Sequence, residues 1–325
     1  MAPVGSILSK ANATMDENQK SARRGMHHAR RVVIKAGTPV VTHVDGNVAL
    51  GRIGALVEQI AHLRQQGREV VLVSSGAIST GMLRMRKSMT LNSTVQDTMY
   101  SSKSHTVPAA PSAAVGQALL MNLYETLFSK YNLSCAQVLI TEDDVSDGET
   151  LSQVRDTTME LLQLGTIPII NDNDAITSRS VPVMDDETGE IRWDNDSLSA
   201  VLASTLRADL LVMLTDLDGL YTAPPDGKVE PERLPFYVPD TPFVLSGIHN
   251  SQWLLSDNGR GKFAGRTRLS AEGMDSLVEA ARSAVSGGVR CAAVVTGHHP
   301  LSLMLLMRGE DVGTLFVNPA PSARL

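Results

Sequence analysis

The 325-residue sequence predicts an α/β fold in which helices cover both faces of a mainly parallel open sheet, giving a three-layer αβα sandwich. Two observations support this prediction. Short runs rich in Val and Ile, such as residues 31–37 and 69–78, alternate along the chain with amphipathic helical patterns. These runs are apolar throughout, which is typical of strands buried on both faces. Ligands of such sheets bind beyond the carboxyl ends of the strands, so the residues after each strand are the first candidates for a site.

The first third of the chain predicts strand, helix, strand and loop. Residues 31–37 form a buried strand that ends in glycine. The helix that follows has an apolar stripe at spacings of three and four, and Gly67 ends it. The stripe consists of Leu50, Ile53, Val57, Ile60 and Leu63. Residues 69–78 predict a second strand, and residues 86–112, rich in Ser, Thr and Pro, predict a long mobile loop.

The rest of the chain continues the alternation of helices and strands. Helices are predicted at 113–131 and about 150–164, with strands at 136–140 and 167–172. Residues 181–193 alternate around a polar turn and predict a hairpin. Asp194 or Asp196 then caps a helix over 196–208. The remaining predictions are a strand at 210–216, a long irregular segment over about 218–270, a helix at 271–288, and strands at 291–297 and 312–317.

Composition and charge argue against several classes of protein. The formal charge of −6 argues against bulk binding of nucleic acid, although it leaves room for a local cationic pocket. No apolar run reaches 18 residues, so we expect no membrane span. The two cysteines, Cys135 and Cys291, lie in strand-like runs. We therefore expect buried thiols in a reduced, cytoplasmic protein rather than a disulfide or a metal site.

The N-terminal 30 residues are polar and have no apolar secretory segment. Their basic, acid-poor run predicts a flexible, solvated N-terminal arm, with a targeting signal as the alternative. His27 and His28 belong to this arm, and we do not expect them to bind a metal. No linker rich in Pro, Gly and Ser divides residues 31–318, which we expect to form one domain.

The ends of the first two strands suit a phosphate. Lys35 lies between a β-branched run and a glycine, and burying its ammonium is costly unless it meets an anion. Gly37 and Gly76 are expected to let backbone N–H groups approach such an anion closely. Thr38 and Ser75 are the adjacent hydroxyl-bearing residues.

Two dense runs of Asn and Asp, residues 171–174 and 194–196, follow later in the chain. Asn and Asp also favour turns and helix caps, and for either run alone that is the competing interpretation. Carboxylates bind Mg²⁺ or an ammonium, and amides bind a carboxylate. Together with the phosphate-type residues, the two runs are what phosphoryl transfer from a nucleotide to a small zwitterion requires.

Six motifs resemble, in order and spacing, the glutamate 5-kinase family of the amino acid kinase superfamily. They are VVIKAGTPVV, VVLVSSGAISTG, AAVGQALL, IPIINDNDAI, WDNDSLSA and LLVMLTDLDGLY. The resemblance covers residues 31–317 and extends to the kinase half of the bifunctional enzymes that make pyrroline-5-carboxylate. We expect neither their reductase domain nor the RNA-modification-type domain of many bacterial relatives. The two Asn/Asp motifs point away from aspartate, acetylglutamate, carbamate and uridylate kinases.

This resemblance implies ATP-dependent phosphorylation of the γ-carboxylate of L-glutamate, the first step of proline biosynthesis. It also implies the amino acid kinase fold, Mg²⁺ as a cofactor, proline as a feedback inhibitor and a homo-oligomer, either a dimer or a tetramer. No protein nucleophile or general base is required, because the glutamate carboxylate is already ionised at neutral pH. The positive charge of Lys35, backbone N–H groups and Mg²⁺ would offset the repulsion between the two anionic reactants.

The resemblance also implies roles for individual residues. Lys35 would contact the transferring phosphate as a catalytic residue, and Asp196 would orient Lys35. Glutamate would be bound by Ser75, Gly76, Ala77, Asn171, Asp174 and Asn195, with Asp174 on its α-ammonium. The nucleotide would be bound by Lys35, Gly37, Thr38, Thr215, Asp216, Gly273 and Met274. No side chain is expected to hold a metal directly.

The sequence departs from the family at one position of the nucleotide site. The family places a lysine three residues after the Met of its Gly-x-Gly-Gly-Met loop, and that position is Leu277. We weigh three explanations. The missing charge comes from a phosphate lid formed by Lys262, Arg266 and Arg268, which is the explanation we favour; the enzyme is slow; or the protein is a non-catalytic ligand-binding regulatory relative.

Overall fold

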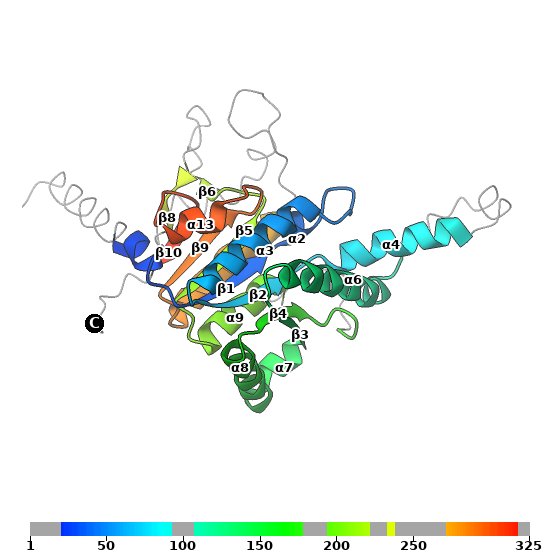
Figure 1. The fold of residues 1–325 in the computed structure, drawn as a ribbon, viewed down its shortest axis with the longest axis horizontal. Coiled ribbons are helices and arrows are strands. Elements are labelled where there is room, and N and C mark those ends of the chain that lie inside the picture. Colours follow the sequence, from blue (N-terminus) through cyan, green and yellow to red (C-terminus); the bar gives the residue numbers. More distant parts are fainter. Residues whose placement is uncertain (1–20, 93–106, 178–193, 222–232, 238–270, 318–325) are drawn as a thin grey trace, which may run out of the picture.

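An eight-stranded sheet forms the centre of the computed structural model, which describes residues 21–92, 107–177, 194–221, 233–237 and 271–317 (Figure 1). The strand order is β3-β4-β2-β1-β5-β9-β10-β8. The strands are β1 (Arg31–Ala36), β2 (Glu69–Ser74), β3 (Cys135–Ile140), β4 (Ile167–Asp172), β5 (Leu210–Thr215), β8 (Phe236–Tyr237), β9 (Cys291–Thr296) and β10 (Thr314–Val317). Neighbouring strands are parallel except β9 and β10, which confirms the predicted mainly parallel α/β sheet.

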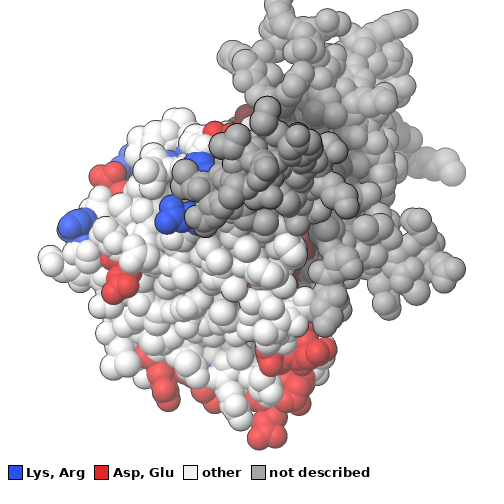
Figure 2. All heavy atoms as spheres, turned by 90° about the vertical axis from the view of Figure 1, so that its right-hand side faces the viewer, with Lys and Arg blue, Asp and Glu red and all other residues white. Residues whose placement is uncertain are grey.

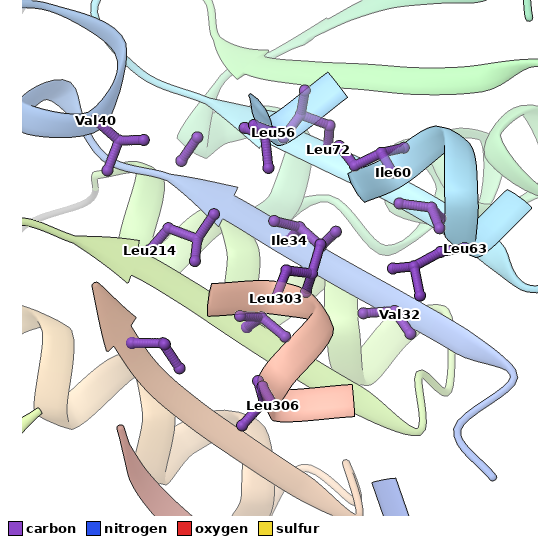
Figure 3. Packing of buried hydrophobic residues seen from close by; sticks show 14 of the residues in the cluster. Val32, Ile34, Val40, Leu56, Ile60, Leu63, Leu72, Leu214, Leu303 and Leu306 are labelled. Atoms are coloured by element: carbon purple, nitrogen blue, oxygen red, sulfur yellow. The ribbon is translucent and has the colours of Figure 1, made fainter. Parts of the chain in front are cut away.

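Helices cover both faces of the sheet, as the apolar runs predicted. The first face packs against α3 (Leu50–Gln65), α6 (Ala109–Ser129) and α13 (Ser302–Met307), and the second against α8 (Gly148–Gln163), α9 (Asn195–Thr205) and α12 (Ala271–Ser286). Figure 3 shows the first core, where Ile34 of β1 lies among Leu56 of α3 and Leu303 of α13. Val33 points to the opposite core, because successive side chains of a strand alternate between faces.

The predicted stripe of α3 is buried at Ile53, Val57, Ile60 and Leu63. Leu50 is the exception, with 62% of its surface exposed, because it is the first residue of the helix and lies beyond the sheet. Gly67 follows the helix with φ +79°, a conformation that favours glycine, so the predicted helix end is confirmed.

The predictions for residues 69–78 and 86–112 are partly wrong. Strand β2 ends at Ser74, and α4 (Ala77–Asn92) begins three residues later. Helix α6 begins at Ala109, so only residues 93–106 of the predicted loop lie outside the described residues. The run of Met, Leu, Arg and Lys in α4 favours a helix, and these propensities outweigh the Ser and Thr residues that suggested a loop.

Helices α4 and α6 touch through two glycines. A Cβ atom on Gly81 would lie 1.8 Å from the carbonyl oxygen of Ser112, and one on Gly116 would lie 1.8 Å from that of Ala77. Any side chain at either position would therefore force the two helices apart. The glycines fix α6 against the start of α4, close to the end of β2.

Within the described residues, three short helices after β1 and three short strands were not predicted. The helices are α2 (Thr38–Val41), α7 (Glu142–Ser146) and α13, and the strands are β6 (Leu220–Tyr221), β7 (Arg233–Leu234) and β8. Helix α7 begins with a capping box between Thr141 and Asp144. The three strands correct the described parts of the segment predicted to be irregular. The hairpin predicted at 181–193 lies outside the described residues.

The predicted flexible arm does not extend to residues 21–30. Residues 21–26 are helical, and Met26 and Ala29 are buried. The Arg23 guanidinium donates to Asp311 Oδ1 at 2.6 Å and lies over the Phe236 ring, 5.4 Å from its centroid. These contacts pack the segment against β8 and the approach to β10, although its sequence has no apolar periodicity that would have indicated packing.

The prediction of buried thiols is confirmed for Cys291 and only in part for Cys135. Cys291 is buried and Cys135 is half-buried; both are free, and burial raises their pKa values to about 12 and about 11. No described helix has the length and apolar character needed to cross a bilayer. The face in Figure 2 has scattered Lys and Arg, and its acidic groups gather at the level of α7 and α8 in Figure 1.

Candidate active site

The strand connections make the carboxyl ends of β1 and β5 the expected ligand site of this sheet, and we call this region the crevice. From β1 the chain continues to β2 on one side, and from β5 it continues to β9 on the other, so the direction of winding reverses between these neighbours. The Gly37 N–H donates to the Leu214 carbonyl at 3.0 Å, and the Ser75 N–H donates to that of Ala36 at 3.0 Å. Sheet bonding therefore already uses the Gly37 N–H, and the approach of backbone N–H groups to an anion near Gly37 and Gly76 stays a prediction.

Lys35 and Asp196 form a buried ion pair in this crevice. Lys35 Nζ lies 2.6 Å from Asp196 Oδ1, and their side chains are 8% and 12% exposed. Burial raises the pKa of Asp196, and the Lys35 ammonium opposes that shift. The contact with Asp196 fixes the position of the Lys35 ammonium. Because both side chains are buried, water screens the attraction between this ammonium and an incoming anion only weakly.

The first turn of α9 places Asp196. Asp194 Oδ1 accepts hydrogen bonds from the N–H groups of Asp196 (3.0 Å) and Ser197 (2.9 Å), so Asp194 rather than Asp196 caps the helix. Its other carboxylate oxygen accepts from Ser276 Oγ of α12 at 2.7 Å. This bond ties the helix behind the nucleotide motif to the helix that carries Asp196.

The end of β4 holds the first Asn/Asp run. Asn171 is 1% exposed, and its Nδ2 donates to Gln117 Oε1 of α6 at 2.9 Å. The Asp172 N–H donates to Asn195 Oδ1 at 3.2 Å, so β4 and the first residue of α9 are joined directly. Among the described residues the amide NH₂ group of Asn195 has no partner, and it is a suitable donor for a carboxylate.

Asp174 lies in the turn after β4 and is partly buried. Burial, with a contribution from the charge of Asp172, raises the pKa of Asp174 to about 6. An ammonium placed beside Asp174 would reverse that shift, because it favours the charged carboxylate.

The run 171–174 also leads into a turn, as the competing interpretation of the sequence predicted. The carbonyl of Asn173 accepts hydrogen bonds from the N–H groups of Ile176 and Thr177.

The turn after β2 carries Ser75, Gly76 and Ala77. Gly76 has φ +96°, and a Cβ there would come within 3.0 Å of Val41 Cγ1, so the turn requires glycine. Beneath it, Ser74 Oγ and Tyr124 OH share a buried hydrogen bond of 2.9 Å, and burial raises the pKa of Tyr124 to about 12. Ser74 Oγ also donates to the Ser75 carbonyl at 3.3 Å.

The residues predicted for the nucleotide are spread over three elements. Thr38 begins α2, three residues after Lys35, and Thr215 Oγ1 at the end of β5 donates to Asp216 Oδ1 at 3.1 Å. Gly273 and Met274 lie in the first turn of α12, where only the backbone is described. The proposed lid residues Lys262, Arg266 and Arg268 lie outside the described residues.

Leu277 faces the core rather than the crevice. It is 1% exposed and belongs to the hydrophobic cluster between α12 and the sheet, together with Val278 and Ala281. Among residues 35–38, 74–77, 171–177 and 215–219, which follow four strands, Lys35 is the only Lys or Arg.

Sequence reasoning missed three side chains that support the site: Gln117, Tyr124 and Ser276. Each lies on a helix and contacts a residue at a strand end or helix cap. The only available signal was that Gln117 and Tyr124 lie seven residues apart and therefore share one face of α6. That spacing does not reveal which residues of the sheet this face of α6 contacts.

Comparison with known proteins identifies the family. The model of the amino acid kinase family matches residues 30–296. The chain belongs to the amino acid kinase family. It is 36% identical to Glutamate 5-kinase of Symbiobacterium thermophilum, with 90% of this chain and 98% of that protein covered. It is 38% identical to Delta-1-pyrroline-5-carboxylate synthase 2 of Oryza sativa subsp. japonica, with 96% of this chain covered.

The chain spans about two fifths of the length of such plant synthases, since the match covers 40% of the rice protein. Among solved structures it is similar to the N-acetylglutamate synthase from Neisseria gonorrhoeae, with a TM-score of 0.53 and 15% identity. That match covers 95% of this chain and 64% of the other. At this identity the likeness supports the amino acid kinase fold and not a shared reaction.

Proposed function

We propose that this amino acid kinase family member is a glutamate 5-kinase. It transfers the γ-phosphoryl group of ATP to the γ-carboxylate of L-glutamate and forms L-glutamyl 5-phosphate, the first step of proline biosynthesis. The observation that carries the proposal is the buried Lys35–Asp196 pair beside the Asn171–Asp174 run. This arrangement places a cation that can bind phosphate next to amides and carboxylates that can bind a zwitterionic amino acid. The similarity to a glutamate 5-kinase over nearly the full length of both chains supports it.

In this proposal the protein positions two anions and neutralises their charge. A γ-carboxylate oxygen of glutamate attacks the γ-phosphorus as the bond to ADP breaks. Lys35, held by Asp196, stabilises the charge on the transferring group. Asp174 and Asn171 bind the α-ammonium, Asn195 donates to a carboxylate, and Ser75 to Ala77 shape the pocket. Thr38, Thr215, Asp216, Gly273 and Met274 surround the nucleotide.

Mg²⁺ is proposed as the cofactor that neutralises the nucleotide phosphates. The carboxylates near Lys35 have other partners, since Asp196 binds Lys35 and Asp194 accepts three hydrogen bonds. The described residues contain no group of three His, Cys, Asp or Glu side chains arranged to hold a metal. These residues fit a Mg²⁺ ion whose ligands are mainly phosphate oxygens and water molecules, which is usual for Mg²⁺ in kinases.

The test is glutamate- and Mg²⁺-dependent release of ADP, with hydroxylamine trapping the acyl phosphate as the γ-hydroxamate. We expect turnover with L-glutamate and none with aspartate, N-acetylglutamate or UMP. Lys35→Met should lower turnover by a factor on the order of 10²–10³, whereas Lys87→Met, at an exposed lysine of α4, should retain it. A clean preparation without glutamate-dependent turnover would overturn the proposal in favour of a non-catalytic ligand-binding protein.

We further propose that Lys262, Arg266 or Arg268 supplies the cation that Leu277 does not. Three glycines interleave with Arg260, Lys262 and Arg266, a composition that suits a phosphate-binding loop. Lys262→Ala or Arg266→Ala should raise the KM for ATP or lower turnover sharply. Unchanged kinetics in both single variants and in the double variant would contradict this compensation.

Regulation and assembly are proposed from the same resemblance. Proline would compete with glutamate in the pocket, and the chain would form dimers or tetramers in the cytoplasm. Inhibition by proline that is relieved by excess glutamate, together with the mass measured by light scattering, tests the first two points. Non-competitive inhibition, or a monomer at working concentration, would contradict the corresponding part.

A further inference from the structure

Asn171 is a buried amide whose oxygen has no hydrogen-bond partner among the described residues. Its Nδ2 donates to Gln117 Oε1 at 2.9 Å. Its Oδ1 is fully buried and accepts no hydrogen bond from the described part of the chain. Buried polar atoms are rarely left without a partner, and exceptions concentrate where a ligand or an unseen water completes the bonding. The oxygen is therefore a candidate acceptor for a ligand donor.

The orientation of this amide depends on Gln117. Asn171 lies on the α6 face of β4, because Ile169, two residues earlier, belongs to the core under α6. Gln117 is partly buried on α6, directly after Gly116. A Cβ on Gly116 would lie 1.8 Å from the Ala77 carbonyl oxygen, so α6 is fixed against the start of α4. Gln117 thus reaches Asn171 from a rigid position.

The surroundings of Asn171 favour a cationic donor. Asp172 is the next residue, and Asp174 lies in the turn that follows. The negative charge of these carboxylates at the end of β4 favours an ammonium over a carboxylate in this part of the site. A primary ammonium has three N–H donors, enough to bind a carboxylate and an amide oxygen together.

We propose that Gln117 is a positioning residue for the acceptor amino acid: by accepting from Asn171 Nδ2, it holds Asn171 Oδ1 as an acceptor for the substrate α-ammonium. The inference deepens the proposed function and rests on it for the identity of the amino acid. Gln117 touches neither substrate nor phosphate in this arrangement. It acts through Asn171 and makes the pocket select a free amino group.

The test compares three variants by calorimetric binding of L-glutamate and of glutarate, which lacks the amino group. Gln117→Met removes the acceptor and should weaken L-glutamate binding about tenfold or more, with little change for glutarate. Gln117→Glu can only accept, so it should restore glutamate affinity to within about threefold of the parent. Glu125→Met, on the exposed side of α6, is the matched control and should bind like the parent.

Each result decides the proposal. It is wrong if Gln117→Met binds glutamate like the parent, or if Gln117→Glu is as weak as Gln117→Met, which would mean that Asn171 presents its NH₂ group. Equal weakening for glutamate and glutarate would indicate a purely structural role and also overturn it. Because binding is measured without turnover, an inactive parent with the expected pattern contradicts the kinase activity and leaves the positioning role. A parent that does not bind glutamate contradicts both.

Discussion

The two sides of the crevice are built differently. On the acceptor side, at the ends of β2 and β4, buried polar groups bind other side chains or backbone groups, as in the Asn171–Gln117 and Ser74–Tyr124 contacts. On the nucleotide side, the described part of α12 contributes Leu277 to the hydrophobic core and Ser276 to the cap of α9. Lys35 and Asp196 lie between the two sides.

Under the proposed function, the described fold largely preforms the acceptor pocket. Charge for the nucleotide phosphates would then come mainly from Lys35, from Mg²⁺ and from other parts of the chain. Preformed polar networks hold catalytic groups without reorganisation during the reaction. Substitutions on the acceptor side should therefore alter the discrimination of glutamate, and substitutions at α12 should alter stability first.

The largest effect is expected at the boundary, in Lys35→Met. Turnover should fall by a factor on the order of 10²–10³, because a phosphate-stabilising cation is lost. Stability should fall by about 3–5 kcal/mol, since Asp196 would stay buried without its partner. Steady-state kinetics and urea unfolding measure the two effects.

The double variant Lys35→Met/Asp196→Leu separates these roles. It should recover most of the stability, because no unpaired charge remains, and none of the turnover. Recovery of activity in the double variant would contradict a direct role for Lys35.

Leu277→Lys tests whether the nucleotide side can be restored to the family pattern. Residue 277 lies in the core, so the ammonium would be buried without a partner. We expect a loss of about 3–5 kcal/mol in urea unfolding and no gain in turnover. Leu277→Met, which conserves volume, should cost under about 1.5 kcal/mol. A stable and faster Leu277→Lys enzyme would show that this position reaches the phosphates.

The pH dependence of glutamate binding tests the acceptor side. The pKa of Asp174 is raised to about 6, and only its ionised form attracts the α-ammonium. The KM for glutamate should therefore rise about tenfold between pH 7 and pH 5 while the KM for ATP changes little. In Asp174→Asn the KM should be high and nearly independent of pH over this range; an unchanged pH profile in this variant would rule out Asp174 as the group responsible.

The raised pKa of Asp174 also affects the stability of the protein without substrate: low pH weakens glutamate binding but favours the folded state. The folded state binds the Asp174 proton more tightly than the unfolded state, whose carboxyl titrates near 3.8. The contribution of Asp174 to stability is therefore greatest below pH 3.8 and is lost as the pH rises through about 6. Comparing urea midpoints of parent and Asp174→Asn between pH 4 and pH 7 measures it.

The smallest effect is expected in Tyr124→Phe. The change removes the hydrogen bond to Ser74 and should cost about 1 kcal/mol in unfolding free energy. Because Ser74 also bonds the Ser75 carbonyl, the KM for glutamate should rise by a small factor. Tyr131→Phe, at an exposed tyrosine just beyond α6, is the matched control. If both variants behave alike, the Ser74–Tyr124 contact does not support the pocket.

The sequence alone determined the sheet and the polar residues at its carboxyl edge. Short, uninterrupted apolar runs that end near Lys35, Ser75, Asn171 and Thr215 favour buried strands, and parallel strands bring their carboxyl ends to one edge. It also indicated that a helix begins near Asp194, because a short acidic side chain before an apolar pattern is a cap signal. Lys35, Asn171 and Thr215 lie at or near strand ends as expected, and their roles in binding stay predictions.

Only the tertiary structure decided which groups meet across elements. Helical periodicity predicts that one face of α6 is buried, but not that Gln117 meets Asn171 or that Tyr124 meets Ser74, because contact partners depend on packing between distant segments. The same holds for α12, where the sequence revealed a leucine in place of a lysine and the fold put that leucine into the core. Packing also bonded the Gly37 N–H to Leu214 and left Asn171 Oδ1 as an acceptor without a partner in the described chain.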